Sequence, residues 1–176
     1  LTIDTVQQSA DGTIKSRFRT HDGHLVEGVL IPTTSRYTAC VSSQIGCSLS
    51  CKFCATGYMD RKRNLEFDEI YDQVVLINQQ CESTYKKKLS NIVFMGMGEP
   101  MMNWKAVSPS LSLLNDPRAL GIGARHITIS TVGVLPGILA LGERPEQFRL
   151  AISIHAPTDA LRRSLMPVNI KYPLAD

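Results

Sequence analysis

The chain has 176 residues, 43% of them hydrophobic, and 19 lysines and arginines against 16 aspartates and glutamates give a formal net charge of +3. This indicates one globular domain with a sizeable core, and the mildly basic charge permits a nucleic-acid partner without requiring one. No apolar run reaches membrane-spanning length and no N-terminal segment has a signal peptide's layout, so we expect a cytoplasmic protein with no membrane contact. In such a reducing compartment, clustered cysteines bind metals or do catalysis more often than they form disulfides.

The front of the chain is predicted to be a small β-meander. Residues 13–20 and 25–32 alternate loosely on either side of the turn signal HDGH, and a third strand, 37–43, follows the turn TTSR. We therefore assign residues 1–36 to an N-terminal β-strand extension.

Strands and helices alternate after a long loop rich in Gly, Ser and Cys. Helical spacing or short apolar runs predict helices at 66–81, 103–115, 135–143 and 158–165, and strands at 90–96, 125–131 and 148–156. Pro109 must start, kink or interrupt the second helix. About four parallel β/α units follow from Cys40 onward, which predicts an α/β fold. Four units do not close a barrel, so we expect residues 37–176 to be the N-terminal part of a barrel core, truncated at its C-terminus.

Unusual residues follow three of the predicted strands. They are Gly96 to Pro100, Ser130 with Thr131, and Ser153 to His155. Ligands of parallel α/β folds bind at the C-terminal ends of the strands. We therefore expect these groups to lie on one rim, which the cysteine loop also joins.

Three of the five cysteines form the pattern C-x3-C-x2-C at Cys47, Cys51 and Cys54. A structural zinc site would need a fourth ligand that no nearby pair supplies. An electron-transfer iron–sulfur cluster usually has four cysteines. A four-iron cluster held by three cysteines leaves one iron open to bind a small molecule, and we favour that interpretation over the other two.

The motif, with Phe53 before its last cysteine, resembles the signature of radical S-adenosylmethionine (SAM) enzymes. The segments CVSSQIGCSLSCKFCATG, MGMGEPMMN, ITISTVG and LAISIHAP resemble, in order, those of the dual-specificity RNA (adenine-C2) methyltransferase family, which is RlmN/Cfr-like. The resemblance runs from about residue 11 to the end of the chain. It implies a partial (β/α) TIM-like barrel of the radical SAM type.

The resemblance also implies an activity. The family methylates an adenine ring carbon, C2 in its main branch and C8 in its resistance branch, in large-subunit ribosomal RNA and, for the main branch, transfer RNA. Its cofactors are a [4Fe-4S] cluster and SAM, and the reaction passes through a methyl-cysteine that would lie beyond this segment. We further expect an external electron donor such as a flavodoxin, and a monomer.

Site residues are carried over from matching positions. Cys47, Cys51 and Cys54 match the cluster ligands. The cofactor-binding positions are Gly98, Glu99, Ser130, Ser153, Ile154 and His155. On local grounds alone, a strand-end serine is usually a cap and a lone histidine is more often structural, and the glycine could belong to a plain tight turn.

Two further positions match catalytic residues of the family. Cys40 matches the resolving cysteine, although a buried strand cysteine would read the same. Glu27 matches a proposed general base, whose pKa should be raised if the side chain points inward, but an alternating strand also places carboxylates on its solvent face. Cys81 matches nothing and is interpreted as incidental.

Two alternatives to the RNA methyltransferase remain. One is a radical SAM enzyme with a non-RNA substrate, and the other is an iron–sulfur electron-transfer or sensor module. The basic run 61–63 follows the cluster loop at the rim, where phosphate contact and a solvated loop are equally expected, whereas 86–88 is interpreted as solvated.

Overall fold

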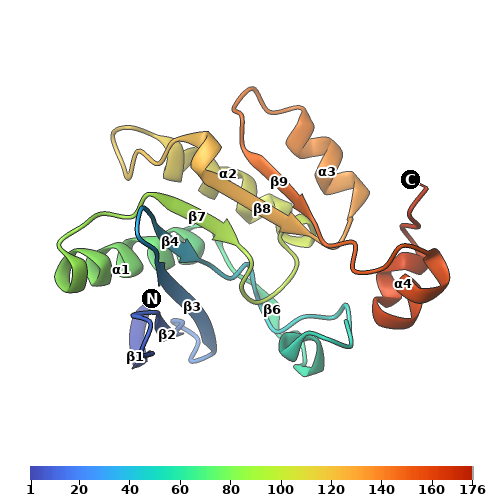
Figure 1. Cartoon of the computed structure of the whole chain (residues 1–176), viewed down its shortest axis with the longest axis horizontal. Helices are drawn as coiled ribbons and strands as arrows, with labels where there is room; N and C mark the ends of the chain where they lie inside the picture. The colour runs from blue at the N-terminus through green and yellow to red at the C-terminus, as the bar shows by residue number, and fades with distance from the viewer. Residues whose placement is uncertain (176) are drawn as a thin grey trace.

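A computed structural model describes residues 1–175 of the chain. Figure 1 shows one large sheet with helices along one side of it. The sheet has seven strands in the order β1-β2-β3-β4-β7-β8-β9, and a separate two-stranded ribbon pairs β5 with β6. The strands are β1 (Thr2–Gln8), β2 (Ile14–Arg19), β3 (Leu25–Pro32), β4 (Tyr37–Cys40), β5 (Gln44–Ile45), β6 (Arg63–Asn64), β7 (Asn91–Phe94), β8 (Ile127–Thr131) and β9 (Arg149–Ile152). The helices are α1 (Phe67–Tyr85), α2 (Trp104–Asn115), α3 (Leu135–Gly142) and α4 (Asp159–Leu165).

The sheet divides into an antiparallel and a parallel part. Strands β1 to β4 pair antiparallel, whereas β4, β7, β8 and β9 pair parallel in chain order. Helices α1, α2 and α3 make the connections between the parallel strands and lie on the same side of the sheet (Figure 1). Because the strand order never reverses, this is the arrangement of a barrel segment, and the predicted α/β fold with four β/α units is confirmed.

The buried side of the sheet packs on α1. Strands β2 and β3 bury alternate residues, and Gly28 is one of the buried residues. A larger residue would not fit at this position, because its Cβ would lie 2.8 Å from the ring of Phe18. Helix α1 contributes an apolar stripe at helical spacing, in which Ile70, Val74 and Cys81 are 0% exposed. Cys81 is therefore a core residue.

Three local predictions need correction. Strand β1 was not predicted, because most of its residues are exposed on both faces and no burial pattern marks it. Helix α1 continues past the predicted end to Tyr85, where Lys86 adopts a left-handed conformation with φ of 56°. Helix α2 runs through Pro109 without interruption. Both Pro109 and Lys105, whose carbonyl loses its helical donor, lie on the exposed side of α2, so water can hydrate that carbonyl.

The proposed boundary at residue 36 falls in the turn between β3 and β4, and the sheet is continuous across it. No helix in residues 1–175 combines the length and apolarity needed to cross a bilayer. The same strands that bury residues against α1 direct the intervening residues, such as Glu27 and Cys40, to the opposite face of the sheet.

One buried side chain joins α1 to the end of β4. Gln73 is 0% exposed, its Oε1 accepts from Ser42 N at 2.9 Å and its Nε2 donates to Ser42 O at 3.1 Å. Gln73→Leu leaves both backbone groups unpaired in the core. We expect it to lower the free energy of unfolding by about 2–4 kcal/mol in urea denaturation. The exposed Gln79→Leu on the same helix is the control, and equal losses in the two variants would contradict this role.

Candidate functional site

The cysteine loop leaves the sheet after β4 and returns as β6. Its two ends are held together because β5 pairs with β6, matching Gln44 with Asn64 and Ile45 with Arg63. The Gln44 side chain also donates from Nε2 to Asn64 Oδ1 at 2.7 Å. Residues 46–62 therefore form a closed loop with a fixed base.

Arg63 anchors this base to the rest of the fold. Its guanidinium donates to Asp22 Oδ2 at 2.7 Å and to Glu69 Oε2 at 2.6 Å. The bond from Arg63 holds the pKa of Asp22 below its usual value. The same Glu69 carboxylate caps α1 by accepting from Glu66 N at 2.9 Å. Arg63 is thus committed to two carboxylates, and of the basic run 61–63 only Arg61 and Lys62 remain exposed for phosphate contact.

The turn of Gly98, Glu99 and Pro100 that follows β7, called the GEP turn below, packs directly on the start of the cysteine loop. Ser43 N and Gln44 N donate to Met97 O, and Glu99 N donates to Gln44 Oε1 at 2.9 Å. Gly98 has φ of +90°, and a Cβ there would lie 2.4 Å from Gln44 Cβ. Glycine is therefore required at Gly98 by both the backbone angle and the close approach.

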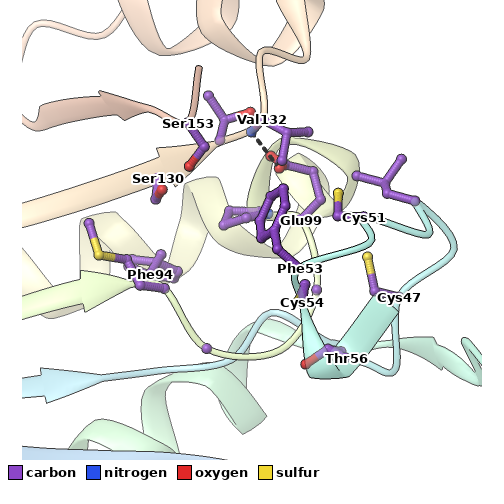
Figure 2. A pocket seen from close by; sticks show the side chains of 16 residues that line it. Cys47, Cys51, Phe53, Cys54, Thr56, Phe94, Glu99, Ser130, Val132 and Ser153 are labelled. Atoms are coloured by element: carbon purple, nitrogen blue, oxygen red, sulfur yellow. Dashed lines mark hydrogen bonds between the residues drawn. The ribbon is translucent and has the colours of Figure 1, made fainter. Parts of the chain in front are cut away.

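Loop and strand ends together enclose a cavity of about 270 Å³. Figure 2 shows the cysteine loop on one side of it and the ends of β8 and β9 on the other. The lining includes the predicted residues Cys47, Cys51, Cys54, Gly98, Glu99, Ser130 and Ser153. The structure thus brings together seven positions that lie up to 106 residues apart, between Cys47 and Ser153.

The three thiols suit a multi-atom centre. Burial raises the pKa of Cys47, and burial together with the charges of the neighbouring cysteines raises that of Cys51 to about 11. The raised pKa values favour the protonated thiols. Coordination to iron would reverse this preference, because a metal-coordinated cysteine is a thiolate. Across residues 1–175 no three His, Cys, Asp or Glu side chains converge closely enough to hold a single ion. All three cysteines line the same cavity, so they could hold a cluster there.

Glu99 presents a buried carboxyl group to the cavity. The side chain is 3% exposed, its Oε1 accepts from Met101 N and its Oε2 accepts from Val132 N, each at 3.0 Å, as the dashed line in Figure 2 shows for Val132. Burial raises the pKa of this carboxyl. Within residues 1–175 it forms no salt bridge. A bound ammonium group would supply the missing positive charge, which fits the amino group of SAM.

Two predicted cofactor positions lie beside the cavity. His155 stacks on Phe53, which lines the cavity, with ring centroids 4.2 Å apart. Its φ of 59° is in the left-handed region, which is unusual for a residue other than glycine. Ile154 instead lines a second cavity, and only its backbone belongs to the turn that joins Ser153 to His155.

The predicted catalytic pair lies outside the cavity, on the same face of the sheet. The register pairs Val29 with Cys40. Glu27 precedes Val29 by two residues in β3, so Glu27 and Cys40 lie on the same face of the sheet. Burial raises the pKa of the Cys40 thiol. Glu27 does not point into the core: its side chain is 45% exposed and pairs with Lys15 Nζ at 2.8 Å. The inward orientation that the sequence left open for Glu27 is therefore not adopted.

Sequence reasoning missed the residues that shape the cavity through hydrogen bonds made by backbone amides. Val132 N–H fixes Glu99, and Thr131 Oγ1 accepts from Gly133 N and Val134 N to shape the turn after β8. Only the Ser-Thr pair at the end of the strand signalled this turn. Arg162, discussed below, is a further residue that no sequence pattern singled out.

Comparison with known proteins supports the cysteine-loop interpretation. Among curated proteins, the chain is 68% identical over 176 residues to a probable dual-specificity RNA methyltransferase RlmN of Gemmatimonas aurantiaca, covering 100% of this chain and 48% of that protein. It is 55% identical over 169 residues to a protein of the same name from Cytophaga hutchinsonii, covering 96% of this chain and 46% of that protein. The chain spans about half the length of the curated relatives it matches. The resemblance expected from its four segments is confirmed.

A solved structure agrees in fold. The crystal structure of a radical SAM methyltransferase from Sphaerobacter thermophilus matches with a TM-score of 0.96 and 44% identity, over 99% of this chain and 51% of that one. The family model described as the Radical SAM superfamily matches residues 41–172, which include the cysteine loop and the strand ends lining the cavity. The chain belongs to the Radical SAM superfamily.

Proposed function

We propose that the chain is part of a radical SAM methyltransferase that methylates an adenine ring carbon, C2, in large-subunit ribosomal RNA and transfer RNA. The observation that carries this proposal is the single cavity shared by three cysteines, a buried carboxylate and two strand-end serines. The names of the relatives, RNA methyltransferase RlmN, support the choice of substrate. The proposal places the protein in the cytoplasm as a monomer that receives electrons from a donor such as a flavodoxin.

Within this proposal the chain's own residues have distinct tasks. Cys47, Cys51 and Cys54 hold a [4Fe-4S] cluster, which when bound supplies the single electron that cleaves the sulfonium of SAM. Glu99 binds the cofactor's amino group. The hydroxyls of Ser130 and Ser153 and the turn at Ile154 and His155 hold the remainder of the cofactor.

Glu27 and Cys40 would act on the other partner in the reaction. Both lie on the sheet face that no described helix covers, where an extruded base could reach them. Glu27 is proposed as the proton acceptor. Cys40 is proposed as the thiolate that attacks the sulfur of a methyl-carrying cysteine, so that a disulfide forms as the bond between that sulfur and the transferred carbon breaks, and the electron pair of that bond stays with the carbon, which is then protonated. Exposed Arg61 and Lys62 would contact RNA phosphates.

The cluster assignment can be tested by anaerobic reconstitution of the full-length protein with iron and sulfide. We expect an EPR signal that changes when SAM is added, because an iron without a protein ligand is open to the cofactor. Cys54→Ala should lose most of the bound iron, whereas Cys81→Ala, which removes a core thiol, should retain it. An EPR signal indifferent to SAM would indicate an electron carrier, and unmethylated adenine in the RNA of a complemented cell would indicate another substrate.

Glu99→Gln tests the ammonium site. The substitution removes the charge at nearly constant volume, and we expect SAM to bind at least about tenfold more weakly in equilibrium dialysis, with unchanged iron content. The exposed Glu143→Gln is the matched control. Equal SAM affinity in Glu99→Gln and wild type would rule out a charge-based role for this carboxylate.

Cys40→Ala tests the proposed disulfide step. Without this thiol the product cannot be released, so we expect cofactor cleavage to continue and a covalent protein–RNA adduct to accumulate on denaturing gels. Cys81→Ala should give no adduct. Normal turnover by Cys40→Ala would show that Cys40 only packs in the sheet.

A further inference from the structure

Arg162 on α4 is a buried guanidinium that is bonded only to neutral groups. It is 3% exposed, and among the described residues no carboxylate forms a salt bridge with it. Its Nε donates to Ile154 O at 3.2 Å, its Nη1 donates to Asn169 Oδ1 and to Tyr172 O, and its Nη2 donates to Val132 O. A buried charge is costly to desolvate, so this position requires all of these acceptors.

One of these acceptors, Val132, lines the cavity, and a second, Ile154, directly follows the lining residue Ser153. Val132 accepts from Arg162 through its carbonyl, and its own N–H donates to Glu99 Oε2 at 3.0 Å. Arg162 therefore lies one residue removed from the carboxylate that faces the cavity.

The second acceptor, Ile154, lies between Ser153, which lines the cavity, and His155, which stacks on Phe53. The left-handed φ of 59° at His155 is unfavourable for a residue with a side chain and needs external support. The hydrogen bond from Arg162 Nε to the preceding carbonyl supplies such support on the side away from the cavity.

We propose that Arg162 is a positioning residue for SAM binding: it ties the turn after β8 to the turn after β9, and thereby sets the distance between Glu99 and Ser153 across the cavity. Lysine cannot replace it, because one ammonium has three donors and cannot reach acceptors on both turns and on the segment from Asn169 to Tyr172. The inference rests on the proposed cofactor site and adds to it a residue that does not touch the cavity.

The test compares Arg162→Lys with Arg163→Lys in the full-length protein. Arg163 is the exposed neighbour on α4 and gives the same change of side chain without the buried contacts. In Arg162→Lys we expect hydrogen exchange of the Val132 and Ser153 amides to be faster and SAM to bind about tenfold more weakly by equilibrium dialysis. Iron content should stay close to that of Arg163→Lys. The thermal midpoint should fall, because buried acceptors lose their donors, so both measurements are made well below that midpoint.

A second variant guards against loss of the fold. Asn169→Ala removes one acceptor of Arg162 and keeps the guanidinium, so it should shift both measurements in the same direction by a smaller factor. Unchanged amide exchange in Arg162→Lys, or faster exchange with unchanged SAM affinity, would overturn the inference. A wild-type protein that holds the cluster but does not bind SAM would instead overturn the proposed cofactor site, and the inference with it.

Discussion

The contact between Gly98 and Gln44 determines where every other part of the cavity can lie. The backbone of the GEP turn reaches the cysteine loop so closely that a single Cβ would overlap Gln44. Gln44 accepts from Glu99 N with one side-chain atom and donates to Asn64 with another. The end of β7, the entrance of the loop and its exit are thus joined through one amide. Movement of any of the three would shift the thiols relative to the carboxylate.

This junction is stabilised by ion pairs near the surface and by hydrogen bonds between uncharged groups in the core. Arg63, at the loop exit, lies near the surface and is held by Asp22 and Glu69. Gln73, deep under β4, bonds only to backbone groups of Ser42 and Glu69. The difference follows from solvation, because an ion pair near water has little desolvation cost, whereas an amide satisfies buried backbone groups without introducing a charge.

Much of the cavity could be predicted because its residues can be recognised from the sequence immediately around them. The spacing from Cys47 to Cys54 is a chain-local property, and strand-end residues such as Ser130 and Ser153 reach one rim in any parallel sheet. Strand β1 gave no such signal, since it is exposed on both faces. The roles of Arg63 and Arg162 could not be predicted either. Each lies beside other basic residues, and only long-range packing decides which of these side chains is bonded to the rest of the fold.

Glu99 and Arg162 are opposite charges on the two sides of Val132, and their hydrogen bonding distinguishes their tasks. Arg162 has four acceptors for its five N–H donors, all from the protein, so its bonding capacity is nearly filled. Glu99 accepts from two backbone amides and has free acceptor capacity directed at the cavity. A ligand with a positive group therefore gains most at Glu99, because Arg162 carries the same sign of charge as that group. Its bonds can only keep Glu99 and the turn at His155 in register for that ligand.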